Sequence, residues 1–154
     1  MTTMLNLAVQ ESHKHFSALC FNQAWEYIER ESERSTEENL AMLHAAIASL
    51  WHWSQREDVS APELAVGYWQ VSRVYCLLKQ PHNARTYGLQ SLKYARDLAP
   101  FYKGYAYETL ARAEMIVNNR VIMHTHLERA HAMLAEIENE EERELLARDL
   151  ESIR

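Results

Sequence analysis

The chain contains little glycine and little proline, with three of each among its 154 residues. Both residues are frequent in the turns of sheet-rich proteins and in disordered segments, so their scarcity argues against those classes. Hydrophobic residues make up 47% and charged residues 25% of the chain, which is typical of a folded helical protein. A chain of this length is best described as one domain, large enough to bury about two thirds of its unfolded surface.

The sequence also lacks the features that direct a chain to membranes or nucleic acid. Its longest stretch without formal charge, Asn39 to Gln55, is shorter than the ~18 apolar residues of a membrane span. A secretory signal requires a basic residue before its apolar part, and the first ten residues contain none. A formal net charge of -6 leaves no surplus of positive charge for a phosphate backbone. We therefore expect a cytoplasmic protein that binds neither membranes nor nucleic acid.

Cysteine is scarce as well, since Cys20 and Cys76 are the two that the chain contains. They lie far apart in the sequence, without the close spacing of a metal site. In a cytoplasmic protein, such residues are usually reduced and buried thiols. We expect that state for both.

The spacing of apolar residues predicts an all-α fold of about seven antiparallel helices. Prolines at positions 62, 81 and 100 are evenly spaced, and each marks the start of a helix. Further starts are marked by capping boxes, in which residues three positions apart satisfy each other's backbone amides: Ser35 with Glu38, Ser60 with Glu63, and Asn139 with Glu142. The predicted helices span residues 4–32, where a break near Asn22 stays open, then 36–56, 61–79, 81–98, 101–117, 121–135 and 139–153.

Three of these helices have distinctive faces. Helix 36–56 is apolar nearly all round, so we expect neighbours to cover it on more than one side. Helix 81–98 carries a seam of small side chains that lets another helix approach closely: Ala84, Gly88, Ser91 and Ala95. The last helix has a charged outer face and one apolar stripe, as a terminal cap requires: Leu146, Leu150 and Ile153.

The two helices at 61–98 can be laid over the two at 101–135 with one constant offset in residue number. This offset aligns similar residues: Tyr68 with Tyr107, Val71 with Leu110, Ser72 with Ala111, Ala84 with Met123, and Ser91 with Ala130. The pattern resembles the tetratricopeptide repeat. Over roughly residues 15 to 150, the chain also resembles a group of bacterial tetratricopeptide-like proteins, through His44 to Trp53, Trp69 to Tyr75 and Ala106 to Ala113. The resemblance implies helical hairpins in a short right-handed superhelix with a C-terminal capping helix, and it brings no catalytic residues.

Arg73 is the only formal charge between Glu63 and Lys79. Burying a guanidinium without a partner costs too much free energy. Arg73 must therefore pair with a buried carboxylate or face an open groove. In the tetratricopeptide register, Trp69 and Arg73 lie one turn apart on the face that lines the family's groove. Their equivalents one repeat later are Glu108 and Arg112. An aromatic ring beside an arginine suits a peptide carboxylate or a planar ligand. The alternative is a structural ion pair of Arg73 with Glu108 or Glu114.

Eight histidines raise the question of metal binding. His124 and His126 are two positions apart, as are His13 and His15, which places each pair on different faces of a helix. A Glu-x-x-His pair ends at His131, but a di-iron bundle needs a second pair, and the sequence offers none. We therefore assign no metal ligands and no cofactor, and keep a metal-binding helical protein as a second alternative.

The function that we expect is a non-catalytic helical-repeat adaptor that binds a peptide or protein segment. Its groove would be lined by Trp69, Arg73, Glu108 and Arg112. Self-association through an exposed apolar face is equally open, since a short solenoid has open ends. His44 and His52, on a nearly uncharged helix, are expected as hydrogen-bonded core residues. They also define the competing hypothesis, a small-molecule sensor or enzyme whose pocket is formed by His44, His52, Trp53, Trp69, Arg73 and Tyr75.

Overall fold

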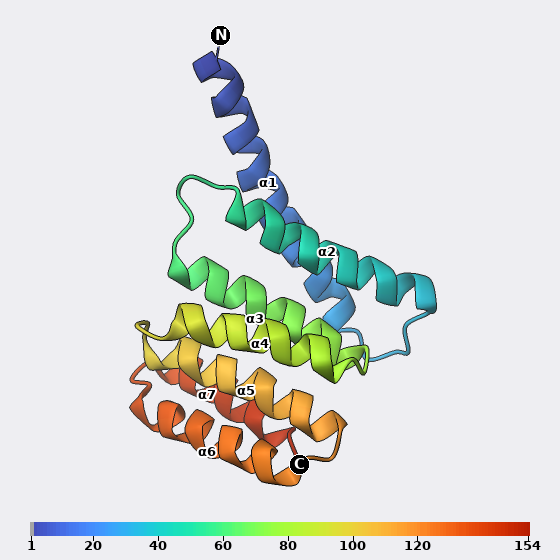
Figure 1. Ribbon diagram of the computed structural model, residues 1–154, viewed down its shortest axis with the longest axis vertical. Coiled ribbons are helices and arrows are strands. Elements are labelled where there is room, and N and C mark those ends of the chain that lie inside the picture. The colour runs from blue at the N-terminus through green and yellow to red at the C-terminus, as the bar shows by residue number, and fades with distance from the viewer. Residues whose placement is uncertain (1) are drawn as a thin grey trace.

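A computed structural model describes residues 2–154 as seven helices without a strand, so the all-α prediction is confirmed (Figure 1). The helices are α1 (Thr2–Ile28), α2 (Thr36–Ser54), α3 (Ala61–Leu77), α4 (Pro81–Ala95), α5 (Pro100–Ile116), α6 (Arg120–Glu136) and α7 (Glu140–Glu151). Each helix packs against the next one along the chain, and the chain reverses direction at each connection. Within this part of the chain, no helix combines the length and the apolar character that a bilayer crossing requires.

Local signals set most of the helix ends. The capping box of Ser35 and Glu38 is complete at the start of α2, where Ser35 Oγ accepts a hydrogen bond from the Glu38 amide. At α7, the Asn139 side chain accepts a hydrogen bond from the Glu142 amide, at 3.0 Å. Helix α1 is continuous through Asn22, which settles the question that the sequence left open.

The starts of α5 and α6 follow those of α3 and α4 at the same constant offset, from Ala61 to Pro100 and from Pro81 to Arg120. The turns that follow α3 and α5 match as well. Lys79 and Asn118, at equivalent positions, both have left-handed backbone conformations with φ of 58° and 56°. The two hairpins thus repeat both the positions of their helices and the shape of their turns.

Hydrogen bonds in these two turns are also equivalent. The amide after each left-handed residue donates to a carbonyl five positions earlier: Gln80 N to Tyr75 O at 2.9 Å, and Asn119 N to Glu114 O at 3.0 Å. The two hairpins therefore end their first helices with the same hydrogen-bonded motif.

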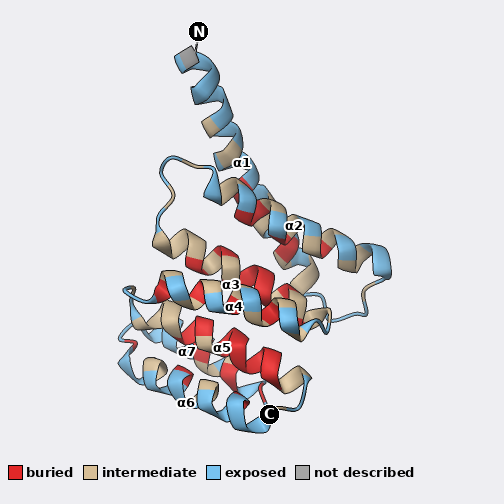
Figure 2. Cartoon of the chain, in the orientation of Figure 1, coloured by how far each residue is buried: buried red, intermediate tan, exposed pale blue. Residues whose placement is uncertain are grey.

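The seam of small residues on α4 is buried between α3 and α5, as predicted: Ala84, Gly88, Ser91 and Ala95. A Cβ added at Gly88 would lie 2.9 Å from Leu110 Cδ2, so α5 approaches this seam closely. The apolar stripe of α7 is buried too, with Leu146, Leu150 and Ile153 at most 5% exposed. Figure 2 shows the buried residues concentrated in α3 and α5, the helices with neighbours on most sides.

Helix α2 packs on α1 and α3, so the prediction of cover on more than one side is confirmed. Its outer side is open, with Leu40, Ile47 and Trp51 exposed at 50%, 36% and 54%, because no further helix of the described chain packs there (Figure 1). Cys76 is buried as expected, whereas Cys20 on α1 is only half-buried.

Candidate functional site: an aromatic cleft beside a buried polar network

Three of the four predicted groove residues form a buried hydrogen-bond network. The Trp69 indole Nε1 donates to Glu108 Oε2 at 3.0 Å, and Arg112 Nε donates to Glu108 Oε1. The exposed fractions of Trp69, Glu108 and Arg112 are 9%, 1% and 5%. Trp69 and Glu108 occupy positions that the constant offset relates, and Arg112 lies one turn after Glu108. The expectation that all three line an open groove is not met, because neighbouring helices cover them.

Helix α7 closes this network. Arg112 Nη2 donates to the Asp149 carbonyl at 2.8 Å and to Ser152 Oγ at 2.6 Å. The Tyr105 hydroxyl donates to Asp149 Oδ2 at 2.7 Å. Burial, and secondly this hydrogen bond, raises the pKa of Tyr105. The C-terminal helix is therefore held to α5 by charged and polar contacts as well as by its apolar stripe.

Arg73, the fourth predicted groove residue, is half-buried. No carboxylate of the described chain lies within ion-pairing distance of its guanidinium. Glu108 pairs with Arg112 instead, and Glu114 pairs with Arg85. The predicted ion pair of Arg73 is therefore wrong. Burial, and secondly the nearby charge of Arg112, lowers the pKa of Arg73. The guanidinium thus forms no ion pair within residues 2–154, although the charges of Glu108 and Asp149 partly oppose this lowering of its pKa.

The two predicted pocket histidines lie apart from the network. His44 is exposed on the outer side of α2, so the expectation of a core histidine is wrong there. His52 is half-buried, and its Nδ1 lies 2.8 Å from Nδ1 of His13 on α1. Burial, and secondly the charge of His13, lowers the pKa of His52. Neither His44 nor His52 lines a cavity with Trp69 or Arg73, so the pocket of the competing hypothesis is not assembled from these residues.

A cleft opens between α1, α3 and α5, and the sequence did not point to it. It consists of two adjoining cavities of about 330 and 190 Å³, which share Phe21, Val66 and Tyr102. We call it the aromatic cleft, and its principal lining residues are Phe21, Trp25, Trp53, Val66, Trp69, Phe101 and Tyr102. Its polar side chains are few: Asn22, Glu63, Ser91 and Asp149, besides the hydroxyls of Tyr102 and Tyr105.

The rings of the cleft contact one another across three helices. Trp25 of α1 lies 5.5 Å from Trp69 of α3, measured between ring centroids. Trp69 lies 5.2 Å from Tyr105 of α5, which lies 5.1 Å from Phe101. Offset and edge-to-face pairs at such distances are favourable beyond the area that they bury. They make the floor of the cleft a continuous aromatic surface.

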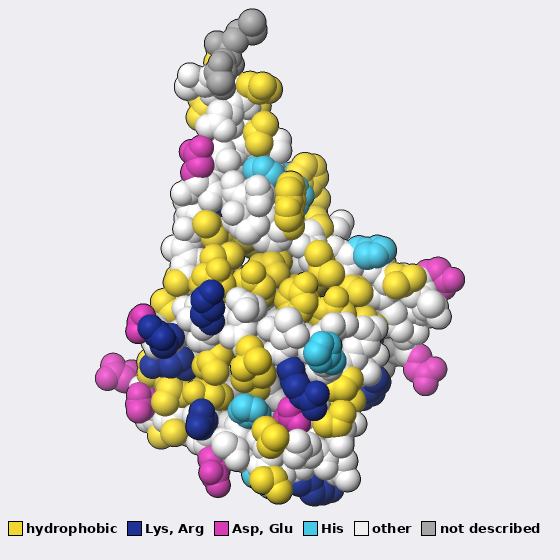
Figure 3. Space-filling model, viewed as in Figure 1, with side chains coloured by type: hydrophobic (Ala, Val, Ile, Leu, Met, Phe, Trp, Pro, Cys, Tyr) yellow, Lys and Arg dark blue, Asp and Glu magenta, His cyan; other side chains and the backbone are white. Residues whose placement is uncertain are grey.

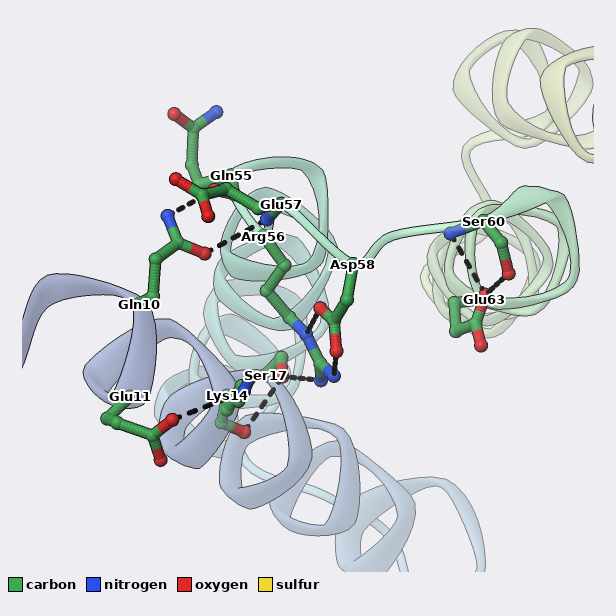
Figure 4. Close-up of polar contacts among 10 residues, drawn as sticks. All are labelled: Gln10, Glu11, Lys14, Ser17, Gln55, Arg56, Glu57, Asp58, Ser60 and Glu63. Atoms are coloured by element: carbon green, nitrogen blue, oxygen red, sulfur yellow. Dashed lines mark hydrogen bonds and ion pairs between the residues drawn. The ribbon is translucent and has the colours of Figure 1, made fainter. Parts of the chain in front are cut away.

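The segment between α2 and α3 connects Trp53 and Pro62, two lining residues of the cleft, and polar contacts fasten it to α1 (Figure 4). Arg56 donates two hydrogen bonds to Asp58, both at 2.8 Å, and one to Ser17 Oγ of α1 at 3.2 Å. These bonds from Arg56 lower the pKa of Asp58 to about 2. The guanidinium of Arg56 also covers the Trp53 ring, 3.9 Å from its centroid. Gln10 adds hydrogen bonds of 2.9 and 3.1 Å to the backbone of the same segment. These contacts hold the segment to α1, and Arg56 covers one face of Trp53, a lining residue of the cleft.

Sequence reasoning missed the contribution of α1 to this cleft. Ala18, Phe21, Asn22 and Trp25 line it at positions i, i+3, i+4 and i+7, which is the spacing of one helical face. Pro62, Val66 and Trp69 follow the same spacing on α3. The periodic signal was present, but α1 lies outside the repeat, so the register could not relate it to α3.

The residues of the cleft suit binding better than catalysis. The Tyr105 hydroxyl in its lining donates to Asp149, but burial raises the pKa of Tyr105 and so disfavours a nucleophilic phenolate. No group of three or more metal-ligating side chains occurs in residues 2–154. An apolar aromatic floor with a few polar groups is typical of sites that bind ligands or peptide side chains. Comparisons of the chain with protein-family models, with curated proteins and with solved structures each find no match.

Proposed function

We propose that this chain is a non-catalytic, tetratricopeptide-like adaptor that binds a short apolar segment of another protein in the aromatic cleft. The observation that carries the proposal is the cleft itself, a preformed concave surface lined by aromatic rings from several helices. Aromatic residues in well-packed pockets supply most of the energy at protein interfaces. The repeated hairpins with their matching turns support the tetratricopeptide-like arrangement, and a cytoplasmic location remains part of the proposal.

Arg73 would supply a polar contact to the bound segment. It lies one turn beyond Trp69 on α3, outside the residues that line the two cavities, and forms no ion pair with the described part of the chain, although the carboxylates of Glu108 and Asp149 act on its charge. We assign to it a carboxylate of the bound segment, from either an acidic side chain or a C-terminus. A guanidinium binds such a group with two parallel hydrogen bonds. The bound segment would then combine large apolar side chains with one negative charge.

Peptide selection followed by affinity measurement tests this function. Peptides from a random displayed library would be selected on the purified protein, and their affinities measured by fluorescence polarisation. Val66→Glu places a charge where the two cavities meet, and we expect it to weaken binding at least ~100-fold, because a buried unpaired charge is worth several kcal/mol. Val121→Glu, at a residue 78% exposed on α6, is the matched control and should leave binding unchanged.

The role of Arg73 is tested separately with the same peptides. Arg73→Gln should weaken binding about 10-fold, and amidation or neutral replacement of the peptide carboxylate should weaken it by a similar factor. The two changes together should be no worse than either alone, since each removes the same contact. Selected peptides that bind Val66→Glu as well as they bind wild type would contradict the proposed site.

A small-molecule sensor is a second candidate, and one observation favours it. The larger cavity, at about 330 Å³, is within the size range of small-ligand sites. The ligand of such a sensor would contact Trp53 and Phe21 rather than His44 and His52. Screening small aromatic compounds for a rise in melting temperature that Val66→Glu abolishes would distinguish the sensor from the adaptor.

A further inference from the structure

The N-terminal part of α1 projects beyond the rest of the molecule, and its own chain leaves it uncovered (Figure 1). It is nevertheless apolar, with Met4, Leu5 and Leu7 exposed at 76%, 68% and 60%. Figure 3 shows hydrophobic side chains along this projecting end. Short helices without tertiary contacts are marginally stable in water, and exposed apolar surface of this kind marks interaction sites.

Four of the exposed apolar side chains form one stripe along α1. Leu5, Val9, Phe16 and Leu19 are 68%, 43%, 42% and 40% exposed, and Ser12 occupies the remaining position of the same stripe. The successive steps of four, three, four and three positions from Leu5 to Leu19 are those of a coiled-coil seam. We call this stripe the α1 ridge.

The α1 ridge is symmetric about Ser12. Leu5 and Leu19 each lie seven positions from Ser12, while Val9 and Phe16 lie three and four positions from it. Two copies that pair antiparallel would therefore place Leu5 beside Leu19, and Val9 beside Phe16. Each Phe16 ring then contacts the smaller Val9 of the other copy, and the two Ser12 side chains lie at the twofold axis. A self-complementary surface of this kind is what a twofold dimer requires.

The charges on α1 favour a second copy as well. The whole chain carries a net charge of -6, so two copies repel each other over most of their surface. From its start to Trp25, the sequence contains one acidic and one basic residue, Glu11 and Lys14, and these pair with each other at 3.2 Å. Identical α1 ridges can therefore meet without like-charge repulsion.

The ridge alone offers a small interface. Leu5, Val9, Phe16 and Leu19 are each at least 40% exposed, but a helical wheel places Leu7 on the opposite side of α1, so the apolar area of the ridge is below the ~800 Å² per partner of a standard interface. Trp51 of α2, which is 54% exposed and contacts the His13 ring, extends this surface at one side.

We propose that the α1 ridge pairs antiparallel with the α1 ridge of a second copy, forming a homodimer. On a helical wheel, the ridge lies on the side of α1 opposite to Ala18, Phe21 and Trp25, which line the aromatic cleft. Dimerisation thus leaves both clefts open. It presents two binding sites to a partner that carries two target segments, which raises the overall affinity.

Light scattering coupled to size-exclusion chromatography tests the dimer on the full chain. Wild type should have twice the monomer mass of 18.1 kDa at micromolar concentrations. Leu5→Glu combined with Leu19→Glu should give the monomer mass with an unchanged helical circular-dichroism spectrum, since both side chains are exposed. Val121→Glu, the matched control on α6, should remain a dimer. A monomeric wild type at high micromolar concentration overturns the proposal, as does a ridge variant that stays dimeric.

Cysteine cross-linking tests the antiparallel arrangement in a Cys20→Ser background. Under mild oxidation, Ser12→Cys should give a covalent dimer on a non-reducing gel. Leu5→Cys alone should not, because its position lies ~10 Å along the helix from the axis, but a mixture of Leu5→Cys and Leu19→Cys proteins should cross-link. Cross-linking of Leu5→Cys with itself overturns the arrangement. A monomeric wild type whose α1 binds phosphatidylcholine vesicles would overturn it too, and would assign the ridge to a membrane surface instead.

Discussion

The indole Nε1 of Trp69 donates a hydrogen bond to the carboxylate of Glu108, 3.0 Å away and 39 residues later in the chain. This separation equals the offset between the two similar hairpins, so the bond joins equivalent positions of α3 and α5. The other oxygen of Glu108 accepts a hydrogen bond from Arg112, whose Nη2 reaches α7. One carboxylate thus connects three helices and helps to seal the C-terminal end of the fold.

Removing this carboxylate should destabilise the protein strongly. Glu108→Ala leaves the Arg112 charge and the Trp69 indole without their partner in a buried site, and we expect a loss of about 3 to 5 kcal/mol in the free energy of unfolding. Trp69→Phe removes only the indole N–H that donates to Glu108. Losing this hydrogen bond should lower the free energy of unfolding by less, about 1 to 3 kcal/mol. Urea denaturation measures both changes. Glu138→Ala, at an exposed position, is the control and should stay within about 0.5 kcal/mol of wild type.

The matching turns after α3 and α5 predict unequal responses to glycine. Lys79 has φ of 58°, which is unfavourable for a lysine, so Lys79→Gly should stabilise the protein by about 1 kcal/mol. Asn118 has φ of 56°, but asparagine tolerates this region, so Asn118→Gly should have a much smaller effect on stability. Equal effects in the two turns, measured by thermal unfolding, would show that backbone strain does not distinguish them.

Acidification should weaken the contact between α1 and α2. The bond between His13 and His52 needs one ring to donate and the other to accept, so both rings cannot be protonated while it persists. Burial first, and then the charge of His13, lowers the pKa of His52, so the unfolded state binds protons more readily than the folded state. Stability is therefore full above the ordinary histidine pKa of about 6.5 and falls as the pH drops from there towards the lowered value.

Urea unfolding at several pH values on both sides of the ordinary histidine pKa measures this slope. His126, whose pKa is also lowered by burial, contributes in the same direction. The comparison that isolates the pair is therefore His52→Gln against wild type, and the variant should have a shallower slope. If His52→Gln and wild type have the same slope, the pH dependence of stability arises from other groups.

The sequence could predict what depends on neighbouring residues along the chain. The capping pair of Ser35 and Glu38 and the prolines at 62, 81 and 100 act within one turn, so they located the starts of four helices. The constant offset between the hairpins holds because the starts of their helices are equally spaced. It related Trp69 to Glu108 as equivalent positions, but it did not predict that they share a hydrogen bond.

What failed depends on packing between helices that no register relates. The apolar pattern of α7 predicted a cap, but it could not say that Asp149 and Ser152 reach over Arg112 and close the expected groove. Similarly, the wheel of α2 predicted cover on more than one side, which α1 and α3 supply, but it could not say that Trp51 stays 54% exposed. The aromatic cleft needed the position of α1 beside α3, which is a tertiary fact.

The four tryptophans provide the most direct test of the central claim, that the aromatic cleft is the site that binds a partner segment. Each indole gives one N–H signal in a ¹⁵N-correlated NMR spectrum. Trp25, Trp53 and Trp69 line the cleft, whereas Trp51 lies on the outer side of α2 and serves as an internal control. On titration with a selected peptide, we predict that the signals of Trp25, Trp53 and Trp69 shift and that of Trp51 does not. A peptide that binds while shifting Trp51 alone, or none of the four, would contradict the account.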